Sequence, residues 1–265
     1  MLNKKYSFLK PIKNPNLARI GRNEDGGYVV DFEIIKNCNT LITFGLGPDW
    51  SFELDYIKKN KKIKIYMYDY TVSSYPYIKD IWKYFRRLIT LRAKFEAVSN
   101  RIKYLYNYLA FLNSKNVTFF KEKITFPVQN KKDADVEKVF SRIDFNEDVI
   151  LKCDIEGSEF EIIDQIVNFS DRIKMLIFEF HWLNNNEEVF FNSVKKLQKN
   201  FDIIHVHGNN HVSKTDTGLP IALEITLLNK KYSPKKIEYK YEFPIKDLDF
   251  PNNPTKQDLF FSFQN

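Results

Sequence analysis

Short apolar runs alternate with segments of helical periodicity along most of the 265-residue chain. The runs predict seven strands, at 40–44, 63–69, 117–120, 149–155, 175–181, 202–206 and 222–228. Apolar residues recur at helical spacing over 51–59, 133–143, 159–167 and 187–199, and Asp133 and Ser158 are expected as helix N-caps. Because such alternation is typical of parallel βαβ units, we predict a single α/β domain. Its mostly parallel, seven-stranded sheet should carry helices on both faces.

One segment interrupts this alternation. Residues 74–114, between the second and third predicted strands, have the pattern of two inserted helices, and the tail from Lys230 onward has the composition of irregular structure. The insertion is basic, through Lys79, Lys83, Arg86, Arg87, Arg92, Lys94, Arg101 and Lys103, and aromatic, through Trp82, Tyr84, Phe85, Tyr104 and Tyr108. Four interpretations stay open: packing on the body, a lid over the substrate, a surface for homo-oligomer formation, and contact with a membrane surface.

Composition narrows the class of protein. Hydrophobic residues make up 43% of the chain, but no apolar run is long enough for a membrane span and the first residues lack a signal-peptide core, so we expect a cytoplasmic protein. Cys38 and Cys153 fall in apolar segments and are expected in the core. The formal charge of +7 suits an anionic partner. No RNA-binding motif accompanies it, so a nucleic acid partner is not expected.

A glycine turn follows the first predicted strand. Gly45 and Gly47 stand between that strand and a helix, where backbone can approach a cofactor closely, and Asp49, Ser51 and Glu53 follow as polar groups. Trp50 occupies the place of the third glycine of a dinucleotide fingerprint, which disfavours a pyrophosphate seat. Asp69 ends the next strand, where a carboxylate can accept ribose hydroxyls. This combination favours S-adenosylmethionine over NAD.

Polar residues also follow the later strands. Asp154 and Glu156 end the fourth, Glu179 and His181 the fifth, and His207 the sixth. Because ligands in open α/β sheets bind at the carboxyl ends of strands, we expect these side chains to meet there. Neighbouring buried acids need a cation, a proton or a hydrogen-bonding ligand.

These pieces together resemble the FkbM-type methyltransferases. The matching segments are Arg22–Val30 with Asp25-Gly26-Gly27-Tyr28, Phe44–Gly47 with Asp49 and 51–53, 68–71, Leu151–Gly157, 179–181 and His205–Asn210. The resemblance implies a Rossmann-like class I methyltransferase fold. It also implies methyl transfer from S-adenosylmethionine to an oxygen, commonly a sugar or polyketide hydroxyl, and it adds Asp25, Gly26, Gly27 and Tyr28 to the expected cofactor site together with Asp154. The insertion at 74–114 departs from the shorter link of the family.

Two hypotheses account for loss of the acceptor proton. In the first, His181 is the general base, oriented by Glu179 or Glu156. In the second, Asp154, His181 and His207, with Asn209 nearby, hold a divalent metal, and this ligand set favours iron or another transition metal.

The basic insertion suggests an acceptor with phosphate groups. A diphosphate under the insertion would fit a nucleotide-activated sugar or a growing bacterial surface glycan, capsular or lipopolysaccharide. Three alternatives stay open: an NAD-dependent oxidoreductase, a basic module that binds nucleic acid or membrane, and a cofactor-binding fold without activity.

Overall fold

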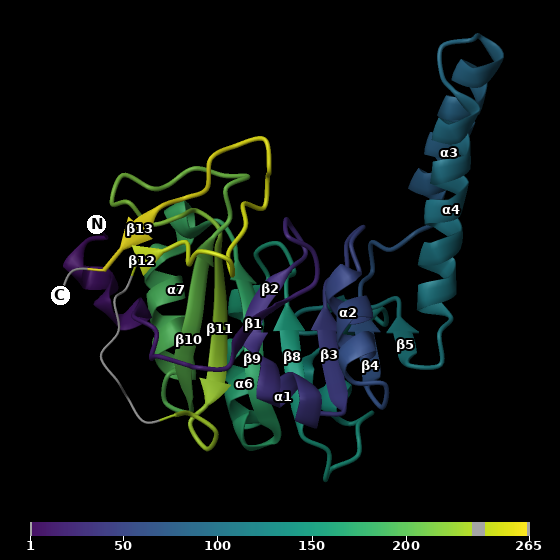
Figure 1. Ribbon diagram of the computed structural model, residues 1–265. Helices are drawn as coiled ribbons and strands as arrows, with labels where there is room; N and C mark the ends of the chain where they lie inside the picture. The colour runs from purple at the N-terminus through teal and green to yellow at the C-terminus, as the bar shows by residue number, and fades with distance from the viewer. Residues whose placement is uncertain (1, 235–241, 264–265) are drawn as a thin grey trace.

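The computed structural model describes residues 2–234 and 242–263 and contains a central sheet of seven strands (Figure 1). In chain order the strands are β3 (Thr40–Phe44), β4 (Lys64–Tyr68), β5 (Val117–Phe120), β8 (Val149–Cys153), β9 (Ile173–Phe180), β10 (Phe201–Gly208) and β11 (Leu223–Asn229). They lie in the spatial order β5-β4-β3-β8-β9-β11-β10. Only β11 runs antiparallel to its neighbours, pairing with β9 and β10. This is the Rossmann-like class I methyltransferase fold, and the predicted fold class is confirmed.

Helices cover both faces of the sheet. One hydrophobic cluster holds α5 (Val136–Phe140), α6 (Ile163–Asn168) and α7 (Leu183–Leu197), and the other holds α1 (Phe32–Asn37) and α2 (Ser51–Lys59). The side chains of β8 alternate between them, since Leu151 belongs to the first and Ile150 to the second. The strands β4 and β5 are added on one side of β3 and the strands from β8 onward on the other, so a ligand crevice is expected at the carboxyl ends of β3 and β8, where the strand order reverses.

The insertion forms a two-helix hairpin of α3 (Tyr75–Ile89) and α4 (Phe95–Leu112). Its base rests on Trp50, whose ring lies 5.0 Å from that of Tyr108 and 5.1 Å from that of Tyr104. Figure 1 shows the hairpin rising beside β5, with its turn far from the sheet. The expected packing of the insertion on the body therefore holds only at the base of the hairpin, where Tyr77 of α3 also packs on Tyr108. Trp82 and Phe85 stay exposed.

Three local predictions differ from the structure. The pattern predicted no strand before residue 40, but β1 (Leu17–Ile20) and β2 (Tyr28–Asp31) form a hairpin. Asp133 lies in the short strand β7 (Asp133–Ala134), where its carboxylate accepts backbone N–H groups of the preceding turn, and Asp135 caps α5 instead. Ser158 precedes the 3-10 helix η2 (Glu159–Ile162), but its side chain makes no capping hydrogen bond.

The remaining described elements are short. They are the 3-10 helices η1 (Lys4–Leu9) and η3 (Ser170–Arg172), β6 (Lys123–Ile124) beside β7, and β12 (Glu242–Phe243) paired with β13 (Phe261–Ser262). The tail after β11 is otherwise irregular where it is described, as predicted, and residues 235–241 lie outside the described part. Within the described residues, no helix has the length and apolar character needed to cross a membrane.

Candidate active site

Two loops meet at the carboxyl ends of β3 and β8. Gly45 has a φ of +77°, and a Cβ atom built on it would lie 1.7 Å from the backbone oxygen of Asp154, so only glycine allows this contact. Gly47 also has a positive φ, of +60°, and a Cβ there would meet no atom within 4 Å. The glycine turn is therefore packed against the backbone that follows β8 on one side and faces open space on the other.

That open space is a cavity of about 340 Å³, which we call the loop cavity. Its volume lies in the range of ligand pockets. Four of the residues predicted for the cofactor site line it, namely Gly45, Gly47, Asp69 and Asp154. Tyr70, Glu122, Lys123 and Ser158 also line it, and none of these was predicted as a residue of the cofactor site.

Asp69 holds the glycine turn in place. Its Oδ2 accepts the N–H groups of Leu46 at 2.9 Å and Gly47 at 3.1 Å, and its Oδ1 accepts the N–H and hydroxyl of Thr71. Burial raises the pKa of Asp69, but these hydrogen bonds outweigh it and the net pKa is lowered. Four donors match the acceptor capacity of a carboxylate, so ribose hydroxyls would have to displace at least one of them.

A second cavity, of about 240 Å³, lies beside the first, and we call it the histidine cavity. Its walls include Asp25, Glu179, His181, Trp182 and Asn209. Asp154 and Glu156 line both cavities and so form the boundary between them. Glu156 reaches this position through a left-handed backbone, with a φ of +56°, after β8 has ended at Cys153. Strand alternation therefore does not explain why the two acids face the same space.

His181 is surrounded by carboxylates. Its Nδ1 lies 2.8 Å from Oε1 of Glu159, and its Nε2 lies 3.7 Å from an oxygen of each of Asp154, Glu156 and Glu179. Burial lowers the pKa of His181, but the Glu159 hydrogen bond and the surrounding charges raise it to about 9. The imidazole is therefore a cation at neutral pH, within a group of carboxylates that exceeds it in charge.

Glu159 fixes this imidazole, and the sequence did not identify it as a site residue. It is fully buried, and its two carboxylate oxygens also accept the N–H groups of Ile155 at 3.2 Å and Gly157 at 2.9 Å. The only signal was a third acid in this segment, directly after the Gly157-Ser158 turn, where it has the appearance of an ordinary residue in the first turn of a helix. Its contact with His181 depends on the pairing of β8 with β9.

Glu179 and Asp154 share a buried donor. The Tyr28 hydroxyl lies 3.3 Å from Oδ2 of Asp154 and 3.4 Å from Oε2 of Glu179, and Asn209 donates to Oε1 of Glu179 at 2.7 Å. Burial, and next the charge of Asp154, hold the pKa of Glu179 well above its usual value. Burial likewise raises the pKa of Asp154, against the opposing charge of Lys152. The pair therefore favours a bound proton or cation.

The structure places His207 apart from this group. Its Nδ1 lies 3.3 Å from Glu224 and its Nε2 lies 3.2 Å from Asp258, so both ring nitrogens already contact carboxylates. β11 lies between β10 and β9 and separates His207 from His181, a strand order that periodicity cannot reveal. The predicted ligand set of Asp154, His181 and His207 is therefore not assembled. Asp154, Glu156 and His181 instead offer ligand atoms within 4.8 Å of one another.

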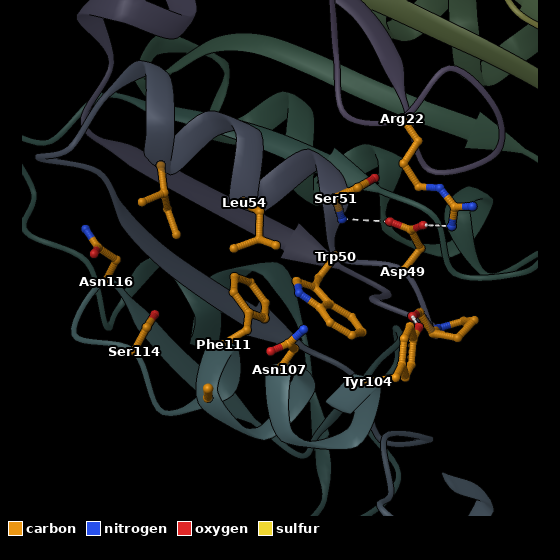
Figure 2. A pocket seen from close by; sticks show the side chains of 13 residues that line it. Arg22, Asp49, Trp50, Ser51, Leu54, Tyr104, Asn107, Phe111, Ser114 and Asn116 are labelled. Carbon is orange, nitrogen blue, oxygen red and sulfur yellow. Dashed lines mark hydrogen bonds and ion pairs between the residues drawn. The ribbon is translucent and has the colours of Figure 1, made fainter. Parts of the chain in front are cut away.

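Asp49 and Ser51 lie in a different groove, between α2 and the base of α4 (Figure 2). Figure 2 shows the Asp49 carboxylate between the backbone N–H of Ser51, at 2.6 Å, and the guanidinium of Arg22, at 2.5 Å. The groove has a volume of about 640 Å³, and the apolar part of its wall includes Trp50 and Phe111. Asp49 and Ser51 therefore orient the start of α2, and they line neither the loop cavity nor the histidine cavity.

The other residues predicted for the cofactor site also lie outside the loop cavity. Glu53 is buried under the sheet, where it accepts a hydrogen bond from Thr43 at 3.1 Å and lies 3.9 Å from the Lys152 ammonium. The Asp25-Gly26-Gly27-Tyr28 turn brings Asp25 and Tyr28 to the side of Glu179, and its glycines pack against Asp49 and Arg22. This early motif thus contributes to the histidine cavity.

Comparison with known proteins gives structural similarity alone. No protein-family model matches the chain, and no curated protein sequence matches it. The fold is similar to that of the precorrin-6y C5,15-methyltransferase of Geobacter metallireducens, at 14% identity and a TM-score of 0.38, over 75% of this chain and 87% of that one. It is also similar to the fibrillarin pre-rRNA processing protein of Methanococcus jannaschii, at 11% identity and a TM-score of 0.40, over 74% and 68%.

Proposed function

We propose that the chain is an S-adenosylmethionine-dependent O-methyltransferase that acts on a sugar hydroxyl. The observation that carries the proposal is the pair of cavities, which lie where the strand order of the sheet reverses and which meet at Asp154 and Glu156. A cofactor in one and an acceptor in the other would bring the methyl donor and the hydroxyl together at that boundary.

The charge of the loop cavity supports the choice of cofactor. S-adenosylmethionine carries its reactive methyl on a sulfonium cation, which Asp154 and Glu156 would attract. The same two carboxylates would repel the diphosphate of NAD. Gly45 and Gly47 give a ligand access to the backbone of the turn, and Asp69 would exchange a hydrogen bond from Leu46, Gly47 or Thr71 for a ribose hydroxyl.

The histidine cavity supports a sugar as acceptor. Glu179 and Asn209 offer oxygen and nitrogen atoms for hydroxyl groups, and half-exposed Trp182 offers an apolar ring face at the edge. A diphosphate group would meet Asp25, Asp154 and Glu156 there and would have to stay outside. Arg86 and Arg87 line neither cavity, so the expectation that the insertion covers the site and holds a diphosphate is wrong. The proposed substrate class is therefore a surface glycan, or an activated sugar whose diphosphate stays outside the histidine cavity.

The transfer forms a bond from the acceptor oxygen to the methyl carbon and breaks the bond from that carbon to sulfur, which keeps the electron pair. The hydroxyl proton has to leave during the attack. His181 is the proposed proton acceptor, through Nε2, since Nδ1 is held by Glu159. Because its pKa is raised to about 9, the imidazole has to lose a proton before it can act as the base. Asp154 and Glu156 would position the hydroxyl at the boundary of the two cavities.

A divalent metal is a second way to remove this proton, and the residues present fit one. A histidine that donates Nδ1–H to a buried carboxylate and turns Nε2 toward other carboxylates is the usual environment of a metal ligand. Asp154, Glu156 and His181 would hold the ion, and as a Lewis acid it would lower the pKa of the acceptor hydroxyl. This set replaces the one predicted with His207.

The proposal is tested by ligand binding and by turnover. Thermal unfolding should shift upward with S-adenosylhomocysteine and stay unchanged with NAD. A panel of activated sugars should then identify an acceptor that supports release of S-adenosylhomocysteine, with and without added metals and after chelation. A thermal shift with NAD alone would contradict the choice of cofactor, and full activity after exhaustive chelation would leave His181 as the base.

A further inference from the structure

The positive charge of the protein is concentrated in the hairpin. Residues 74–114 contain eight lysines and arginines and two acids, which leaves 33 basic and 32 acidic residues for the rest of the chain. The hairpin therefore carries six of the seven units of formal net charge. A general excess of lysine would have spread the net charge evenly along the sequence. The observed net charge is instead concentrated in residues 74–114.

Helix α3 presents an apolar stripe to solvent. Ile78, Trp82, Phe85 and Ile89 recur at spacings of four, three and four residues, which places them on one face. Their exposed fractions are 43%, 60%, 43% and 68%, and no residue of α3 is buried. The side of α3 that contacts α4 is a different one, on which Asp80 binds Arg101 and Tyr77 packs on Tyr104.

A basic stripe runs beside the apolar one. Lys79, Lys83, Arg86, Arg87 and Arg92 line one open hollow on the hairpin, together with Trp82. Asp80 is the one acid in the hollow, and its carboxylate is engaged by Arg101. No carboxylate in the described part of the chain forms an ion pair with any of these five basic residues.

The turn between the two helices is apolar as well. Leu91 is 93% exposed and has a φ of +56°, and Phe95 is 73% exposed. Figure 1 places this turn at the end of the hairpin farthest from the sheet. An isolated exposed apolar residue needs no explanation, but a stripe that continues into a protruding apolar turn marks an interaction surface.

We propose that the α3–α4 hairpin docks on an anionic lipid surface. Exposed apolar residues of α3 and the turn would enter the headgroup region, Trp82 would lie at the boundary, and the basic stripe would contact lipid phosphates, as in amphipathic interfacial helices. A nucleic acid would satisfy the charge but would leave Ile78, Ile89 and Leu91 in water. A second copy of the hairpin would cover the apolar stripe but would bring together two groups of the same excess charge.

Vesicle flotation with the full chain tests this surface. The protein should float with vesicles of phosphatidylglycerol and phosphatidylcholine, remain unbound with phosphatidylcholine alone, and dissociate at high salt. Arg86→Glu with Arg87→Glu should lower the partition coefficient by roughly 30-fold or more, since each basic residue near such a surface contributes roughly fivefold. Ile89→Ser with Leu91→Ser should lower it by roughly tenfold.

The matched control changes the same charge elsewhere. Lys58→Glu with Lys59→Glu alters two exposed lysines at the end of α2 and should leave vesicle binding unchanged. Circular dichroism checks that each variant stays folded. Equal losses in the two charge variants, or no flotation of the wild type, would overturn the proposal. The proposal would also be overturned if the protein did not bind vesicles but bound RNA, or formed a dimer, through the hairpin.

Discussion

The strand-end cluster and the hairpin both concentrate charge of one sign, but they do so in opposite surroundings. Around His181 four carboxylates lie within 3.7 Å of a ring nitrogen, and Glu159 and Glu179 among them are buried. On the hairpin the basic side chains of α3 stand in water. In the cluster each carboxylate is constrained by a hydrogen bond or a neighbouring charge, whereas the hairpin offers its charges to something outside the chain.

This difference in burial decides whether the charges of each region act within the protein or on a partner. Burial makes charges interact strongly, so the pKa values in the cluster shift and its chemistry is determined within the chain. Water screens the charges of the hairpin, so they change little within the protein and act mainly on a partner. Substitutions in the cluster should therefore have large effects on stability and catalysis, and substitutions on the hairpin small ones.

The largest effect is expected where the two loops touch. Gly45→Ala would place a Cβ atom against the Asp154 backbone, and we expect the free energy of unfolding to fall by about 4 kcal/mol or more, with loss of S-adenosylhomocysteine binding. Gly218→Ala is the control, since Gly218 has a φ of +85° but a Cβ atom there would lie 4.0 Å from its nearest neighbour, Leu2. It should cost about 1 kcal/mol. Chemical denaturation measures both, and equal losses would contradict the steric argument.

His207 gives the next effect, through pH. Burial lowers its pKa, but Glu224 and Asp258 raise it to about 10, above the unfolded value of about 6.5. The stabilisation is therefore fully present below about pH 6.5 and is lost as pH rises through 10. His207→Gln leaves two carboxylates without their cation and should cost about 3 kcal/mol at pH 6. Denaturation across this pH range should show the difference from wild type shrinking; a constant difference would contradict the ion pair.

Glu159 tests whether the cluster positions the imidazole. Glu159→Gln keeps the size of the side chain but weakens its hold on Nδ1 of His181, and kcat/KM should fall by about 10- to 100-fold. Binding of S-adenosylhomocysteine should stay unchanged, since Glu159 does not line the loop cavity. Glu161→Gln, on the same 3-10 helix, is the control and should keep its activity. Equal losses in the two variants would mean that Glu159 acts through the fold of the loop.

The smallest effect is expected on the hairpin. Ile89→Ser with Leu91→Ser should change the free energy of unfolding by less than about 0.5 kcal/mol, because both side chains are exposed. Activity on a soluble acceptor should also stay within about twofold of wild type. A large loss of stability or of soluble activity would show that the hairpin packs against the body in solution, and would remove the contrast between the two regions.

The sequence predicted the sheet well because each strand carries its own periodicity. All seven predicted strands are present, most of them within one or two residues of the predicted ends. The early hairpin of β1 and β2, whose strands have four residues each, was not predicted. α5 is shorter than predicted because Asp133 binds the turn before it.

The candidate site was predicted in part. Gly45, Gly47, Asp69 and Asp154 line one cavity, and Asp154, Glu156, Glu179 and His181 meet at the other, because the carboxyl ends of parallel strands share one edge. Asp49 precedes α2, and Ser51 and Glu53 lie in its first turn, where the helix directs Ser51 into the groove beside α4 and buries Glu53. Proximity in sequence was no guide to the direction of these side chains.

By itself, the sequence determined which chemistry the chain can offer: a tight glycine turn, acids and histidines at strand ends, and one basic insertion. Only the tertiary structure decided which of these groups meet. Strand order put β11 between His207 and His181, the pairing of β8 with β9 brought Glu159 to the imidazole, and the hairpin rose beside the sheet instead of covering it. The physical reason is that local patterns follow from each residue and its near neighbours, whereas strand order and helix direction depend on contacts between segments far apart in the chain.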